Sequence, residues 1–74
     1  MNKFRLLRGM LHGRGYNQPE VAELLGLSVS SVSNRYRGKT PWTLDEMYTL
    51  MDAVYADYAQ MSELFPKGGR DAVL

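Results

Sequence analysis

The stretch from Gln18 to Gly38, QPEVAELLGLSVSSVSNRYRG, decides the fold of this chain of 74 residues. It divides at Gly26 into two segments, each with apolar residues at the spacing of one helical face. Gly26 can take the positive φ that ends a helix and turns the chain sharply. The stretch therefore predicts two short helices joined by a tight turn. The second helix is poor in charge and rich in small polar side chains.

Capping residues and a glycine mark where both helices are expected to begin and end. Asn17 and Glu20 have the spacing of a capping box, and Pro19 lies in the first turn, where its missing N–H donor costs nothing. Ser28 is the expected N-cap of the second helix, and Gly38 is expected to end it. Both segments are therefore predicted with defined ends.

The inward faces of the two helices follow from the helical repeat. Val21, Leu24 and Leu25 form the apolar stripe expected for the first helix. Val32 and Tyr36, four residues apart, form the inward face expected for the second.

This arrangement resembles the helix-turn-helix of the lambda-repressor-like, Cro/CI-type family of phage and bacterial regulators. The matching positions are Gln18, Ala22, Gly26, Leu27, Val32 and Gly38. The resemblance covers roughly residues 3 to 65 and includes GKTPWTLDEM (Gly38–Met47), where small phage Cro-like proteins also carry an aromatic residue and a capped fourth helix. It implies an all-α, compact five-helix lambda-repressor-like DNA-binding domain whose helices 2 and 3 form the helix-turn-helix. The chain departs from the family at Arg35, which is often apolar there, and Tyr36 is expected to pack in its place.

Three further helices complete the predicted bundle. One precedes the motif and spans about residues 3–12, and its apolar side consists of Phe4, Leu7, Met10 and Leu11. The fourth begins at a capping box of Thr43 and Glu46, next to Trp42, and its expected inward stripe is Leu44, Met47, Leu50, Met51 and Val54. A fifth helix is expected over about residues 56–64. We expect one domain over residues 1–66 and a flexible tail over residues 67–74.

Charge is distributed unevenly along the chain. The net charge is +1, but residues 1–42 carry seven basic and two acidic side chains, a net of +5. Residues 43–74 carry two basic and six acidic side chains, a net of −4. The basic half contains the helix-turn-helix, as expected of a protein that binds a polyanion.

Composition excludes several other classes of protein. The chain has no cysteine, so it can form neither a disulfide nor a thiolate metal site. His12 has no second ligand at a useful spacing, so no metal or other cofactor is expected. No apolar stretch approaches the length of a membrane span, and no signal-peptide pattern is present. We therefore expect a soluble cytoplasmic protein, and the family resemblance implies a bacterial cell, with a prophage as one source of the gene.

Four residues on the outward side of the second motif helix are candidates for reading bases. They are Val29, Ser30, Ser33 and Asn34. Serine and asparagine are mediocre helix formers, which favours a functional reason for their presence over an ordinary solvated surface. The carboxamide of Asn34 can pair bidentately with adenine, and Val29 can contact a thymine methyl group.

A second set is expected to contact the DNA backbone. Its members are Gln18, Ser28, Arg35, Arg37, Lys39 and Thr40. The family resemblance implies that Gln18 touches the backbone and also braces the recognition helix. Alternatively, Arg37 and Lys39 only complement the dipole at the carboxyl end of that helix.

The carboxyl-terminal half is richer in apolar and aromatic side chains than a bundle of this size needs. We expect Tyr55, Tyr58, Met61 and Phe65 to form a dimer or partner interface. Stacking of single-stranded bases is disfavoured, because Tyr16, Tyr36 and Trp42 fall at staple or core positions.

No candidate pair for general acid–base catalysis, no nucleophilic constellation and no phosphate-binding glycine loop is present, so neither an enzyme nor a small-molecule substrate is expected. The sequence predicts a sequence-specific double-stranded DNA-binding transcriptional regulator, similar to phage Cro-like repressors, which reads the operator major groove with the helix over residues 28–37 as a homodimer. The alternative is an antirepressor or modulator that binds a repressor protein through a helix-turn-helix fold. An antitoxin-like autoregulator is a third reading.

Overall fold

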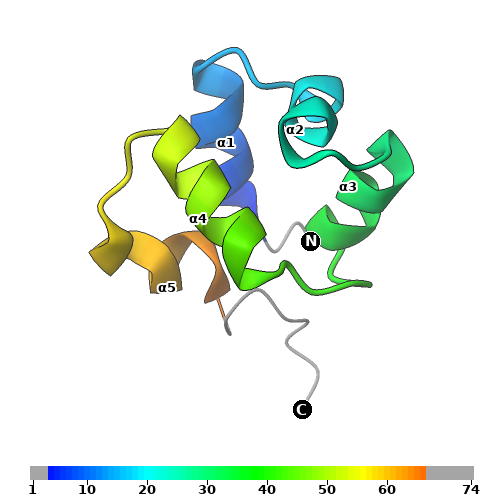
Figure 1. Cartoon of the computed structure of the whole chain (residues 1–74). Coiled ribbons are helices and arrows are strands. Elements are labelled where there is room, and N and C mark those ends of the chain that lie inside the picture. The colour runs from blue at the N-terminus through cyan, green and yellow to red at the C-terminus, as the bar shows by residue number, and fades with distance from the viewer. Residues whose placement is uncertain (1–3, 67–74) are drawn as a thin grey trace.

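The computed structural model describes residues 4–66, and every regular element in this range is a helix (Figure 1). In chain order the elements are α1 (Arg5–Gly13), α2 (Gln18–Leu25), α3 (Val29–Tyr36), α4 (Leu44–Ala53), the 3-10 helix η1 (Tyr58–Gln60) and α5 (Met61–Leu64). The predicted all-α class is confirmed. The tail predicted for residues 67–74 lies outside the described residues.

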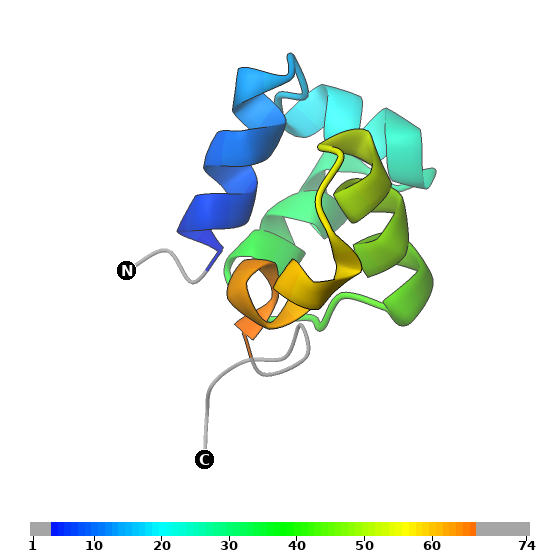
Figure 2. The same cartoon turned by 90° about the vertical axis from the view of Figure 1, so that its left-hand side faces the viewer.

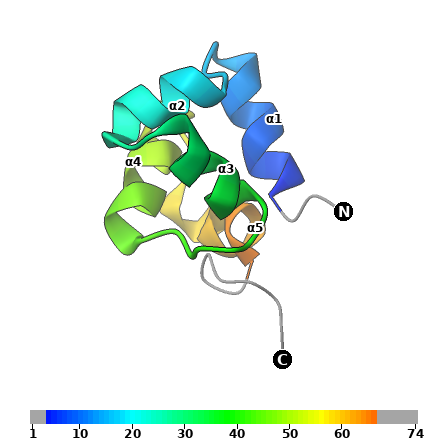
Figure 3. The same ribbon diagram turned by 90° about the vertical axis from the view of Figure 1, so that its right-hand side faces the viewer.

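The helices surround one shared core. Figure 2 shows α1 and α4 on two sides of the molecule, with α5 between their lower ends. Figure 3 faces α3, which lies at the front between α2 and the segment that leads to α4. Because α2 and α3 pack directly against each other, α3 presents its other side to solvent.

Two of the three predicted helix starts are confirmed. The Ser28 hydroxyl accepts a hydrogen bond from the Ser31 N–H at 3.1 Å. Thr43 and Glu46 form a full capping box, with bonds of 3.2 and 3.0 Å in the two directions. The predicted Asn17 cap is wrong, because Asn17 precedes α2 but its side-chain oxygen bonds the His12 ring at 2.6 Å.

Four helices end with the same backbone hydrogen-bond pattern. In each, an N–H donates to the carbonyl five residues earlier at 2.9 Å, as in the Schellman motif, and the pairs are Tyr16 to Leu11, Leu27 to Ala22, Lys39 to Asn34, and Ala56 to Met51. The residue before each donor has a positive φ. Three of these residues are glycines, namely Gly15 and the two predicted helix ends Gly26 and Gly38, whereas the fourth is Tyr55.

Trp42 lies at the centre of the core and is only 3% exposed. Its ring centroid lies 6.0 Å from that of Phe4, 5.4 Å from Tyr36 and 5.9 Å from Phe65. All three contacts are edge-to-face, the geometry that aromatic quadrupoles prefer. The indole N–H has no hydrogen-bond partner among the described residues.

Three predictions about the helix faces and ends are wrong. Leu24 is exposed because α2 turns Ala22 toward the core in its place. Leu44 is 54% exposed because it is the first residue of α4 and lies outside the buried cluster. The fifth helix is not continuous over residues 56–64, because the Asp57 side chain caps η1 by accepting from the Ala59 N–H at 3.0 Å.

No helix within residues 4–66 combines the length and the apolar character needed to cross a bilayer.

Replacement of Trp42 by alanine should lower the free energy of unfolding by about 3–5 kcal/mol, because it empties the centre of the aromatic cluster. Urea unfolding would measure this loss. Leu6→Ala is the control, since Leu6 is 54% exposed and its truncation should change stability by no more than about 0.5 kcal/mol. A Trp42→Ala variant as stable as the parent would show that the cluster does not hold the fold.

Replacement of Gly26 by alanine should cost about 1–2 kcal/mol, because only the left-handed backbone opposes the new methyl group. Gly26 has φ 69°, and a Cβ placed there would meet no atom within 4 Å. Gly9 is equally open but lies inside α1, so Gly9→Ala should stabilise the protein by roughly 0.5–1 kcal/mol. Thermal unfolding of both variants checks the opposite signs, and equal shifts would contradict this account.

Candidate nucleic-acid interface

Gln18 connects the two helices of the α2–α3 pair. It is the first residue of α2, and its side-chain amide donates to the Val29 carbonyl at the start of α3 at 3.3 Å. The predicted bracing role of Gln18 is therefore confirmed. Its contact with a DNA backbone stays a prediction.

The outward side of α3 is most accessible at its amino-terminal end. Val29 and Ser30 are exposed there, whereas Ser33 and Asn34 are half-buried one turn later. Val32 and Tyr36 point into the core, as predicted. A ligand that approaches α3 therefore meets small side chains first, which lets it come close to the helix backbone.

The chain after α3 presents two cations. Arg37 and Lys39 are exposed, and Thr40 beside them is half-buried. The Asn34 carbonyl accepts from the N–H groups of Lys39 at 2.9 Å and Thr40 at 3.4 Å. The backbone that carries these side chains is thus tied to the last turn of α3.

Arg35 does not belong with these free cations, which corrects the prediction that it contacts the DNA backbone. Its Nε donates to Glu46 Oε1 at 2.8 Å, and its Nη1 donates to the Ser31 carbonyl at 3.3 Å. Both charged side chains are only 13% exposed. The same Glu46 oxygen accepts from the Thr43 N–H, so Arg35 joins α3 to the capping box of α4. Its role is structural.

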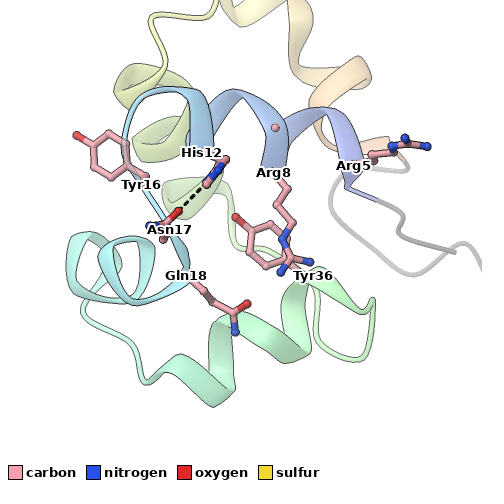
Figure 4. A pocket seen from close by; sticks show the side chains of 8 residues that line it. Arg5, Arg8, His12, Tyr16, Asn17, Gln18 and Tyr36 are labelled. Atoms are coloured by element: carbon pink, nitrogen blue, oxygen red, sulfur yellow. Dashed lines mark hydrogen bonds between the residues drawn. The ribbon is translucent and has the colours of Figure 1, made fainter.

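Sequence reasoning missed a groove between α1 and the α2–α3 pair. Its volume is about 490 Å³ (Figure 4). It is lined by Arg5, Arg8, Gly9, His12, Tyr16, Asn17, Gln18 and Tyr36. The signal in the sequence is the concentration of basic residues before Trp42, two of which, Arg5 and Arg8, lie on α1.

Arg8 and Tyr36 form one wall of this groove. The Arg8 guanidinium carbon lies 5.1 Å from the centroid of the Tyr36 ring, within cation–π range. Burial raises the pKa of Tyr36 to about 12, although the Arg8 charge opposes that rise. The Tyr36 hydroxyl is therefore neutral at ordinary pH, and Arg8 supplies the positive charge.

His12 and Asn17 line the groove where α1 ends and α2 begins. Their hydrogen bond of 2.6 Å links the last turn of α1 to the start of α2 (Figure 4). Because the Asn17 oxygen is engaged by His12, its NH₂ group is left to face other partners. The groove thus gathers hydrogen-bond donors and positive charge, which suits an anion.

Only some residues of the predicted partner interface are exposed to solvent. Phe65 is fully buried against Trp42, so its assignment to that interface is wrong. Met61 packs partly against the core. Tyr55 and Tyr58 are exposed, and Tyr55 lies under the Arg14 guanidinium, 4.5 Å from the ring centroid. No cluster of three metal-ligating side chains occurs within residues 4–66.

Comparisons of the chain with protein-family models, with curated protein sequences and with solved structures find no match.

Replacement of Glu46 by glutamine keeps an acceptor for the Thr43 N–H but removes the charge that holds Arg35. It should lower the free energy of unfolding by roughly 1 kcal/mol, between the values of exposed and buried ion pairs. Glu63→Gln, at an exposed position, is the control. Unchanged stability, together with a gain in DNA affinity, would show that Arg35 contacts DNA phosphates and does not stabilise the fold.

Proposed function

We propose that this chain binds double-stranded DNA sequence-specifically through the outward side of α3 and acts as a transcriptional regulator of the Cro-like kind. The observation that carries the proposal is the setting of α3. Its accessible end presents small apolar and polar side chains, and cations lie on both flanks. Small side chains let a helix approach base edges in the major groove, and flanking cations fix its position on the phosphates.

In this proposal the polar and basic side chains on the two sides of α3 contact the two DNA strands that border the major groove. Arg37 and Lys39 contact one strand just beyond the carboxyl end of α3. Gln18 and Arg8 contact the other strand at the groove beside α2. Their phosphate bonds position α3 without reading sequence.

Base reading then rests on Val29, Ser30, Ser33 and Asn34. The carboxamide of Asn34 has the best chemistry for one base, because it can donate to and accept from the same adenine. Val29 offers an apolar contact to a thymine methyl group. This assignment makes α2 and α3 a helix-turn-helix in function, and it is supported by the Gln18 brace and the left-handed Gly26 turn between them.

Regulation follows from occupancy of the site. A bound domain at a promoter excludes other proteins from the same groove, which is repression by occlusion. A homodimer on an inverted repeat is the expected form, because one such helix buries little surface alone.

The experiment begins with selection of a duplex from a random pool by the full chain. Asn34→Ala should cost roughly 1–3 kcal/mol on the selected duplex and relax preference at one base pair, with little effect on random DNA. Arg37→Ala and Arg8→Ala should weaken binding to all duplexes alike and flatten the salt dependence by about one unit of slope each.

Arg14→Ala is the matched control for charge. Arg14 is exposed but lies over Tyr55, away from α3, so its loss should leave the salt slope unchanged. Failure to select any duplex, or equal losses for Asn34→Ala on selected and random DNA, would refute the base-reading assignment.

A further inference from the structure

The outward side of α4 carries an exposed apolar and aromatic surface. Leu44, Tyr48 and Asp52 follow one another at intervals of four residues, so they share one side of the helix. Tyr58 lies across them, with its ring centroid 4.9 Å from that of Tyr48 and its hydroxyl donating to Asp52 at 2.8 Å. We call these four residues the α4 face.

The α4 face is preorganised. The ring contact and the hydrogen bond fix the Tyr58 side chain, although both tyrosines are exposed. A side chain that is already fixed loses little conformational entropy when a partner binds it. Leu44, which is 54% exposed, adds an apolar contact at the start of the helix.

The chain segment that carries this face is acidic. Residues 43–66 contain five acidic side chains and no basic one. Glu46 is paired with Arg35, whereas the other four acidic side chains are exposed, namely Asp45, Asp52, Asp57 and Glu63. The apolar surface is thus set in a negative field.

This charge disfavours a second copy of the chain as the occupant. A twofold interface places the same patch on both subunits, so acidic groups would meet acidic groups. Like charges across an interface oppose association. In addition, Phe65 is buried, and it was one of the four residues expected at a dimer interface.

We propose that the α4 face docks a basic amphipathic helix of a partner protein. The apolar side of that helix packs on Leu44, Tyr48 and Tyr58, and its lysine or arginine side chains pair with Asp52 and the neighbouring carboxylates. This surface lies on the acidic half of the chain and shares no residue with the proposed DNA contacts. The proposal therefore stands or falls independently of DNA binding.

The test uses the full chain and two synthetic amphipathic peptides with the same leucine face. One carries lysine on its polar face and the other glutamate. Isothermal titration should show the lysine peptide binding at least about tenfold more tightly, with an affinity that falls as salt is added. Leu44→Ala and Asp52→Asn should each weaken that binding by roughly five- to tenfold.

Matched variants separate this surface from general stickiness. Leu6 has the same exposed fraction as Leu44 but lies on α1 between Arg5 and Leu7, so Leu6→Ala should leave the affinity unchanged. Asp52→Asn keeps an acceptor for the Tyr58 hydroxyl, so it removes charge while the face stays assembled. Binding by neither peptide, equal binding by both, or equal loss in Leu6→Ala overturns the proposal. Self-association of the free chain that Leu44→Ala abolishes overturns it in favour of a second copy.

Discussion

The position of α3 depends first on the edge-to-face packing around Trp42. This residue lies in the segment between α3 and α4, and its ring touches Phe4 before α1, Tyr36 at the end of α3 and Phe65 after α5. One side chain therefore connects both ends of the described chain to the last turn of α3. Because interiors are close-packed, α3 cannot rotate without displacing these rings.

Two polar contacts then fix α3 at its ends. Gln18 holds the Val29 carbonyl at the amino end, and Glu46 holds Arg35 near the carboxyl end. The Glu46 contact is largely buried, so it is screened less by salt than an exposed pair. The outward side chains of α3 are thus carried on a helix whose rotation is fixed by the aromatic core and by one polar contact near each end.

Local signals predicted much of the fold, whereas contacts between distant residues were not predictable. The glycine stops and the caps at Ser28 and Thr43 depend on a few neighbouring residues, and the structure confirms them. Asn17 was assigned wrongly because His12, on the preceding helix, takes its side chain. The roles of Arg35 and of the α1 groove were missed because both need side chains from separate helices to meet.

Tyr55 remains the least expected residue of the fold. Three helices end with glycine at the left-handed position, but α4 ends with a tyrosine at φ 55° that is 78% exposed. A side chain there costs roughly 1–2 kcal/mol over glycine, and the exposed contact with Arg14 returns only about 0.5–1 kcal/mol. Stability alone therefore favours glycine, so the tyrosine is not explained by the packing of this chain. Strained residues concentrate where a protein meets its ligands, and Tyr55 adjoins the acidic side of the molecule, where its N–H bonds the Asp52 carbonyl at 3.2 Å. The strained backbone at Tyr55 therefore adjoins the α4 face proposed above as a docking surface.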